Sequence, residues 1–244
     1  MSGLPDLEFR DRLLFPESKR SYNEVHFGVA ASRYDFATRA MSLGRDGAWK
    51  KILADALPPL AAPSCLDLAS GTGDVAFLLA ERYPAGTVVG LDLSGEMLAV
   101  AKRRNTRGNA RFEKGDMCST GFPDDSFEIV TGGYALRNAP DLGRALQEIH
   151  RVLKPGGTAA FLDFSKSPDP LRQRLQLRLL RTWCGLWGFM LHRAWHVHGY
   201  IAESLATFPD RDEFLKLIDA SGFKTVLTKR FFFGMLELAV IRIR

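Results

Sequence analysis

Between residues 64 and 164 the chain alternates short apolar runs with segments whose apolar residues recur every three or four positions. Short apolar runs bounded by turn residues are typical of buried strands, whereas the longer spacing is typical of amphipathic helices. The pattern predicts strands at 65–69, 87–91, 110–112, 127–131 and 158–164. It predicts helices at 75–82, 96–103 and 142–153, the last followed by a turn at 155–157.

Strands that alternate with helices over short connections predict a parallel sheet that helices cover on both faces. Beyond residue 210, a further helix and strands at 225–232 and 235–243 complete what we expect to be a mostly parallel, seven-stranded sheet. Ligands of such sheets bind beyond the carboxyl ends of the strands. Asp92, Asp116 and Arg137 all lie just after a predicted strand, so we expect them to converge on one site.

Composition and charge describe an ordinary globular protein. The chain is 46% hydrophobic and carries a formal charge of +5, but its basic residues are scattered, so no nucleic-acid partner is predicted. Three cysteines far apart in the sequence predict neither a disulfide framework nor a zinc site, and favour a reducing, cytoplasmic environment. The polar N-terminus is unlike a signal peptide, and no apolar run reaches the about 20 residues of a membrane span.

A glycine-rich turn follows the first predicted strand, in the sequence LDLASGTGDV at 66–75. Gly71 and Gly73 allow a tight turn and a close approach of the backbone to a ligand at the N-terminus of the next helix. The spacing also satisfies the dinucleotide fingerprint, and Asp92 ends the next strand, where an acid binds a ribose diol. By itself the loop fits either NAD or S-adenosylmethionine.

Three further acids favour S-adenosylmethionine. Asp67 lies inside the strand before the glycines, where it would orient the loop and reach a bound amine. Asp74 is a poor neighbour for a pyrophosphate but is tolerable beside a sulfonium. Asp116 and Met117 offer an acid for the adenine amino group and an apolar side chain for its ring. Each acid alone would be an ordinary capping or turn residue, whereas acids at successive strand ends indicate a cofactor site.

Several short segments carry a family resemblance that runs from about residue 22 to 244. They are VAASRYD (29–35), MSLG…WK (41–50), LDLASGTGD (66–74), LRN (136–138), RVLKPGG (151–157), FLDFSKSP (161–168), FP (208–209) and SGF (221–223). In these segments the sequence resembles the ubiquinone/menaquinone biosynthesis C-methyltransferases, S-adenosylmethionine-dependent enzymes of the class I methyltransferase fold. RVLKPGG identifies only the superfamily. The alanine-led glycine loop, together with YD upstream and LRN downstream, is more selective.

The resemblance implies a Rossmann-like α/β fold, S-adenosyl-L-methionine as cofactor and a small quinol or aromatic acceptor. Contacts with the cofactor are expected from Asp67, Ala69, Gly71, Thr72, Gly73, Asp92, Leu93, Met97, Asp116, Met117 and the backbone of Gly133. Some members of the family have serine where this chain has Gly133. Asparagine is usual at Thr38 and histidine at Asp46, and both departures concern the substrate side.

The motif GGYALRN, at 132–138, supplies the candidate for catalysis. Methylation of a ring carbon beside a phenol needs electron density on that carbon, which a phenolate supplies and a guanidinium stabilises. We predict that Arg137 polarises or helps to deprotonate a quinol hydroxyl, with Tyr34 and Asn138 completing the hydrogen bonds. Because a guanidinium keeps its proton, water or another side chain must take the quinol proton. The alternative role for Arg137 is a structural ion pair.

The insertion after residue 165 adds further candidates. His192, His196 and His198 lack a supporting carboxylate or cysteine, so no metal is predicted. Instead we expect His196 and Tyr200 to contribute to the substrate pocket. Arginines and large apolar residues interleave between 174 and 191. They fit either a helix packed on the core or an interfacial helix that meets a prenylated substrate at the inner face of the membrane.

We predict a single domain that acts as a methyltransferase. Its segments are an N-terminal arm (1–20), a helical segment on the substrate side (21–60), a cofactor-binding core (61–165), an inserted lid (166–210) and a closing helix with a strand hairpin (211–244). The preferred function is C-methylation of a prenylated quinol precursor in ubiquinone or menaquinone biosynthesis. The alternatives are methylation of another aromatic or polyketide acceptor, an NAD-dependent oxidoreductase, and a non-catalytic cofactor-binding subunit. A homodimer remains open.

Overall fold

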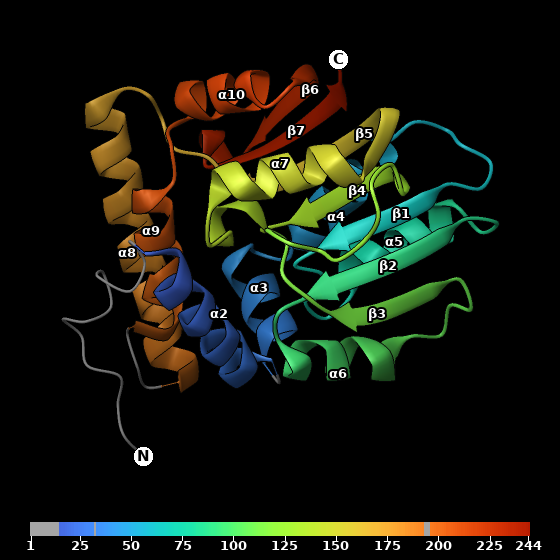
Figure 1. Ribbon diagram of the computed structural model, residues 1–244. Helices are drawn as coiled ribbons and strands as arrows, with labels where there is room; N and C mark the ends of the chain where they lie inside the picture. The colour runs from blue at the N-terminus through green and yellow to red at the C-terminus, as the bar shows by residue number, and fades with distance from the viewer. Residues whose placement is uncertain (1–14, 32, 193–195) are drawn as a thin grey trace.

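A seven-stranded sheet forms the centre of the protein (Figure 1). The computed structural model describes residues 15–31, 33–192 and 196–244, except for the side chains of 191–199. The strands are β1 (Ser64–Leu68), β2 (Thr87–Asp92), β3 (Ala110–Lys114), β4 (Phe127–Gly133), β5 (Leu153–Phe164), β6 (Phe223–Phe231) and β7 (Leu236–Ile243). Their order is β3-β2-β1-β4-β5-β7-β6, and β7 runs in the opposite direction to the other six strands. The predicted mostly parallel sheet is confirmed.

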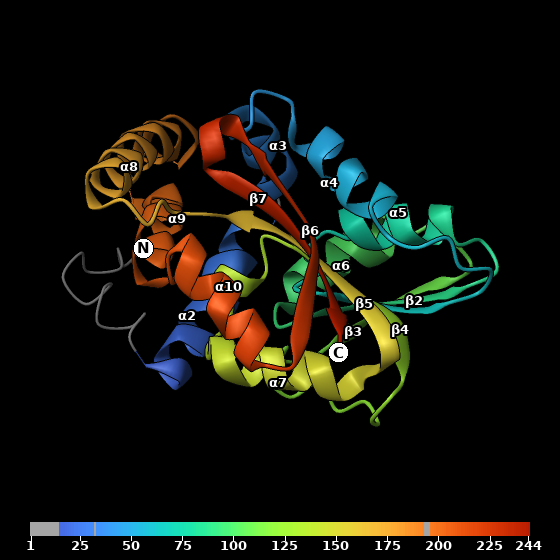
Figure 2. The ribbon, with the colours of Figure 1, turned by 90° about the horizontal axis from the view of Figure 1, so that it is seen from above.

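Helices cover both faces of this sheet (Figure 2). Alternate residues of a strand face opposite sides, so Leu66 and Val130 belong to one hydrophobic core and Cys65 and Ile129 to the other. The helices of the second core are α4 (Asp46–Asp55), α5 (Asp74–Arg82) and α6 (Gly95–Arg104), and those of the first include α7 (Leu142–Val152) and α10 (Arg211–Ala220).

The remaining helices gather at the carboxyl ends of the parallel strands. These helices are α2 (Pro16–Ala30), α3 (Tyr34–Met41), α8 (Pro170–His192) and α9 (His196–Thr207), with short 3-10 turns η1 (Leu136–Asn138) and η2 (Phe232–Gly234). In Figure 1 the arrowheads of β1, β2 and β4 point toward this group of helices. The segments before and after the core therefore enclose the edge of the sheet where the candidate residues lie.

Two predicted boundaries are wrong. Helix α2 begins at Pro16, so the last part of the expected N-terminal arm is helical. A proline suits a first helical turn because its φ is already helical and its missing N–H would have no partner there. Strand β5 begins at Leu153 instead of after the predicted turn, because Gly156 adopts a φ of 73° that lets the strand continue through an irregular register.

Candidate active site

The turn after β1 has the backbone conformation that its glycines predict. Ala69, Gly71 and Gly73 have φ angles of 47°, 56° and 94°. A Cβ atom on Gly73 would lie 2.8 Å from the ring of Phe77, so a side chain there would be strained and would also clash. The glycine at this position therefore allows α5 to start directly against the sheet.

Asp67, in the strand before the turn, holds the turn in place through hydrogen bonds. Its carboxylate accepts hydrogen bonds from Ser70 Oγ and Thr131 Oγ1, both at 2.8 Å. The residue is 1% exposed, and burial raises the pKa of its carboxyl to about 6, although the two hydrogen bonds oppose that shift. Asp67 thus forms a hydrogen bond within the loop and another to β4, and it is not part of the lining of the cleft at the carboxyl ends of β1, β2 and β4.

A narrow cleft lies at the carboxyl ends of β1, β2 and β4. Asp92 Oδ2 accepts a hydrogen bond from the Gly71 N–H, and Oδ1 accepts one from the Ser94 N–H, each at 2.8 Å. Seven of the residues predicted to contact the cofactor line this cleft: Ala69, Gly71, Asp92, Leu93, Met97, Met117 and Gly133. Lining residues that the sequence analysis missed include Asn23, Phe27, Leu91, Ser94 and Gly115.

The other predicted cofactor residues lie beside the cleft. The hydroxyl of Thr72 donates a hydrogen bond to Asp35 Oδ1 at 2.6 Å, and Asp116 Oδ2 lies 3.3 Å from Arg20 Nε. Both side chains therefore contact helices that cover the site. Gly73 is the N-cap of α5 and also lies outside the lining of the cleft.

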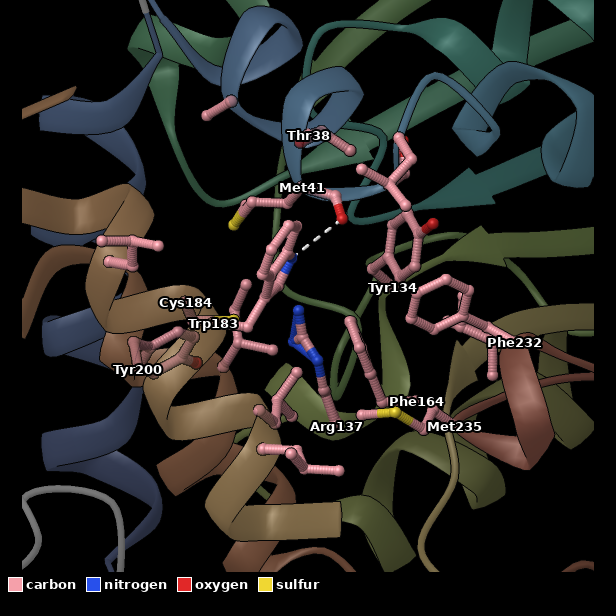
Figure 3. A pocket seen from close by; sticks show the side chains of 18 of the residues that line it. Thr38, Met41, Tyr134, Arg137, Phe164, Trp183, Cys184, Tyr200, Phe232 and Met235 are labelled. Atoms are coloured by element: carbon pink, nitrogen blue, oxygen red, sulfur yellow. Dashed lines mark hydrogen bonds between the residues drawn. The ribbon is translucent and has the colours of Figure 1, made fainter. Parts of the chain in front are cut away.

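A larger, mostly apolar cavity of about 500 Å³ adjoins the cleft (Figure 3). Its lining comes from the helices α2, α3, α4, α8 and α9, from the turns η1 and η2, and from the ends of β5 and β7. It includes Thr38, Met41, Trp49, Phe164, Trp183, Cys184, Tyr200, Phe232 and Met235. The indole Nε1 of Trp183 donates a hydrogen bond to Met41 O at 3.1 Å, which joins α8 to α3 across the cavity. The helices of the insertion, α8 and α9, thus form part of the wall of this cavity.

The two cavities share a wall. Phe27, Tyr34 and Tyr134 line both of them, so a group held in one lies next to a group held in the other. Tyr34 is partly buried, and burial raises the pKa of its phenol, an effect that the charge of Lys50 opposes. This shared wall is the place where two bound molecules would meet.

Arg137 reaches into the larger cavity from η1. In Figure 3 its guanidinium points toward Trp183 and lies beside Phe164, 5.2 Å from the centre of the Phe164 ring. Its Nη1 donates a hydrogen bond to Asn138 Oδ1 at 3.0 Å, and its Nε lies 3.4 Å from Asp163 Oδ1 without forming an aligned hydrogen bond. Arg137 therefore lines the larger cavity and also forms a buried ion pair with Asp163. Its position is compatible with the catalytic role and with the structural role that the sequence left open.

Hydrogen bonds from distant segments hold the LRN turn in place. Asn23 Nδ2 donates to Asn138 O at 2.7 Å, and the Tyr200 hydroxyl lies 2.8 Å from Asn138 Oδ1. Lys19 Nζ donates to Arg137 O at 3.0 Å, and burial together with the Arg137 charge lowers the pKa of Lys19 to about 8. Tyr200 lines the larger cavity and Asn138 the cleft, whereas the side chain of His196 lies outside the described residues.

A buried charge cluster next to the shared wall was not predicted. The Tyr134 hydroxyl donates a hydrogen bond to Asp46 Oδ1 at 2.7 Å, and Lys50 Nζ lies 2.7 Å from Asp46 Oδ2 and 3.0 Å from Asp74 Oδ2. Burial and the adjacent Asp46 raise the pKa of Tyr134 well above its ordinary value. The i, i+4 spacing of Asp46 and Lys50 on α4 was the available signal, but only the fold brings Tyr134 to them.

Comparison with known proteins identifies the family. The model of the ubiE/COQ5 methyltransferase family matches residues 17–240. The chain belongs to this family. It is 33% identical to the ubiquinone/menaquinone biosynthesis C-methyltransferase UbiE of Desulfotalea psychrophila, over 95% of this chain and 94% of that protein. It is also 33% identical to the demethylmenaquinone methyltransferase of Chlorobaculum parvum, over 86% of this chain and 88% of the relative.

The solved structures agree in fold. A putative methyltransferase in complex with the Haloferax volcanii Trm112 activator superposes with a TM-score of 0.67, at 17% identity over 88% of this chain and 96% of that one. Geranyl diphosphate methyltransferase, in complex with S-adenosylmethionine, superposes with a TM-score of 0.60 at 12% identity over 81% of this chain and 85% of that one. The predicted family, the class I methyltransferase fold, the enzyme class and S-adenosylmethionine as cofactor are all confirmed.

Proposed function

We propose that this ubiE/COQ5-family enzyme methylates a ring carbon of a quinol precursor that carries a prenyl chain. The observation that supports this most is the apolar cavity of about 500 Å³, which shares a wall with the cofactor cleft and contains the buried cation Arg137. An apolar pocket with a few polar groups suits an aromatic ring with a hydrocarbon tail. The rat relative, 34% identical, is a 2-methoxy-6-polyprenyl-1,4-benzoquinol methylase.

The cleft fits the cofactor chemically. The Asp92 carboxylate, already held by two backbone N–H groups, would bind the ribose hydroxyls, and the apolar side chains of Leu93, Met97 and Met117 would enclose the adenine. The backbone of the turn at Gly71 and the bare Cα of Gly133 permit a close approach. S-adenosylmethionine supplies an electrophilic methyl group bonded to a sulfonium sulfur.

In this proposal Arg137 stabilises negative charge on the acceptor. Its guanidinium would donate to the phenolate oxygen of the quinol, which increases the electron density of the neighbouring ring carbon. Tyr34, in the wall that the two cavities share, would hold the acceptor ring in line with the methyl group. The new bond joins the methyl group to the ring carbon, the methyl–sulfur bond breaks, and one proton leaves the acceptor.

Tyr134 and the buried carboxylate of Asp46 are the groups that we propose to take this proton. The Tyr134 hydroxyl lies 2.7 Å from Asp46 Oδ1, and Tyr134 lines both cavities. The tyrosine would accept the acceptor's proton while it passes its own proton to Asp46. This provides the second side chain that Arg137 needs, because a guanidinium is a poor base.

The acceptor class is tested by comparing tail lengths. The purified enzyme is supplied with S-adenosylmethionine and reduced, demethylated benzoquinols and naphthoquinols that carry no tail or one, two or three prenyl units. We expect the kcat/KM to rise with the number of prenyl units, measured by mass spectrometry of the methylated ring. Faster methylation of an untailed phenol or polyketide would contradict the proposal and favour an enzyme of secondary metabolism.

The assignment of the cofactor cleft predicts a loss of affinity in Asp92→Asn. The amide replaces one carboxylate oxygen with an N–H group that faces a backbone N–H, and it removes the charge from the bonds to the ribose. We expect S-adenosylmethionine and S-adenosylhomocysteine to bind about 10- to 100-fold more weakly in calorimetric titrations. Unchanged affinity in a variant whose circular dichroism shows an intact fold would mean that Asp92 does not bind the ribose.

A further inference from the structure

Exposed apolar side chains surround the mouth of the acceptor cavity. Phe233 at the tip of the β6–β7 hairpin is 100% exposed, and Leu43 after α3 is 60% exposed, yet both line the cavity. Leu179 and Leu186 of α8 also line it and are exposed. Figure 2 shows the hairpin tip between α8 and α3, so the cavity opens among three segments whose outer side chains are apolar.

The same apolar surface continues along α8. Leu171, Leu175 and Leu179 recur every fourth residue, and Leu186 and Met190 extend the stripe on later turns. Leu171 and Met190 are 75% and 60% exposed. Figure 1 places α8 at the outer edge of the molecule. We call this surface, formed by Leu43, Leu171, Leu175, Leu179, Leu186, Met190 and Phe233, the docking face.

Within the three segments that carry the docking face, all charged side chains are basic. The segments 36–45, 170–192 and 228–236 contain no aspartate or glutamate. They contain seven exposed cations that form no ion pair with a described residue, namely Arg39, Arg45, Arg172, Arg174, Arg178, Lys229 and Arg230. Because these seven charges exceed the +5 of the whole chain, the rest of the protein is net negative.

We propose that the docking face lies on the surface of a bilayer that contains anionic phospholipids, with the cavity mouth opening into the membrane interface. Apolar side chains flanked by arginines suit the boundary between acyl chains and negative headgroups. Among the described residues no helix is long and apolar enough to cross a bilayer, so the contact is peripheral. The docking does not depend on the acceptor, but its use, to receive a tailed quinol from the membrane, rests on the proposed function.

Binding to vesicles tests the charges first. Vesicles of phosphatidylcholine alone are compared with vesicles that also contain 30% phosphatidylglycerol, and bound protein is measured by cosedimentation. We expect binding only to the anionic vesicles, weakened by 0.5 M salt, and reduced about tenfold or more in the double variant R174Q/R178Q. The matched control, K102Q/R103Q, removes two exposed cations of α6 and should bind like the parent.

A second pair of variants tests how much the apolar side chains contribute to vesicle binding. L171Q/L175Q should lose vesicle binding about tenfold, whereas V226Q/L227Q, which changes two exposed apolar residues of β6, should not. Neither pair lines the acceptor cavity, so methylation of a detergent-dispersed, short-tailed quinol should stay at the parental rate. Methylation of a long-tailed quinol embedded in anionic vesicles should fall with vesicle binding.

Three outcomes would overturn the proposal. One is equal loss of binding in the control pairs, and another is no preference for anionic vesicles. The third is a dimer in light scattering that L171Q/L175Q dissociates, which would assign the face to a second copy of the chain. If no quinol is methylated but vesicle binding follows these expectations, the proposed function fails and the docking face stands.

Discussion

Replacing Arg137 with glutamine should lower kcat about 100- to 1000-fold while the dissociation constant for S-adenosylmethionine changes by less than about threefold. Arg137 lines the acceptor cavity and is absent from the cofactor cleft, so its loss should affect the chemical step and leave cofactor binding intact. Lysine keeps the charge but not the planar set of donors, and we expect Arg137→Lys to recover only a small part of the rate. The rate is measured on a saturating short-tailed quinol, and affinity by calorimetry.

Folding must be separated from catalysis in this experiment because Arg137 also faces a buried carboxylate. Burial raises the pKa of Asp163, and the guanidinium opposes that shift, so Arg137→Gln alone leaves Asp163 in a low-dielectric site without its counter-charge. Breaking such a pair costs about 3–5 kcal/mol. The double variant R137Q/D163N removes both charges and should regain most of that stability. A well-folded double variant with parental kcat would show that Arg137 is structural only.

Replacing Lys50 with methionine should lower the free energy of unfolding by about 3–5 kcal/mol at pH 7. Lys50 is 6% exposed and pairs with both Asp46 and Asp74. Its removal leaves the buried carboxylate of Asp46 without a counter-charge, whereas Asp74 keeps its ion pair with Arg104. The matched control is Lys51→Met on the next position of α4. Lys51 forms an exposed pair with Asp55, with 67% of its side chain accessible, and its loss should cost less than about 1 kcal/mol.

The pH dependence of this effect follows from the direction of the pKa shifts. Burial by itself would raise the pKa of Asp74, but Lys50 and, to a smaller extent, Arg104 lower it below 3.8. This carboxylate therefore contributes stability above that pH and loses it as the pH falls further. Burial would lower the pKa of Lys50, but Asp46 and Asp74 raise it above 10.5, so its contribution is lost as the pH rises beyond that value. Urea unfolding should therefore show the full difference between parent and Lys50→Met from about pH 5 to 10. A pH-independent difference would contradict an electrostatic origin.

Local sequence patterns were sufficient to predict most of the residues on the cofactor side of the site. The glycine loop, Asp92 and Met117 each lie at the end of a strand or within a few residues of it. Parallel strands bring their carboxyl ends to one edge whatever the rest of the chain does. Seven predicted residues consequently line one cleft. The exceptions, such as Thr72, whose hydroxyl pairs with Asp35, depend on helices from outside the core.

The acceptor side was determined by contacts between segments that no local pattern relates. Lys19 Nζ reaches the backbone of Arg137 across 118 positions of sequence, and the Tyr134 hydroxyl reaches Asp46 across 88. Periodicity reports which face of an element is apolar, but it does not report which distant element packs against that face. The sequence by itself therefore determined the sheet, the family and the cofactor. Only the tertiary structure decided what Arg137 and Lys50 pair with, because burial of their charges depends on which helices close over them.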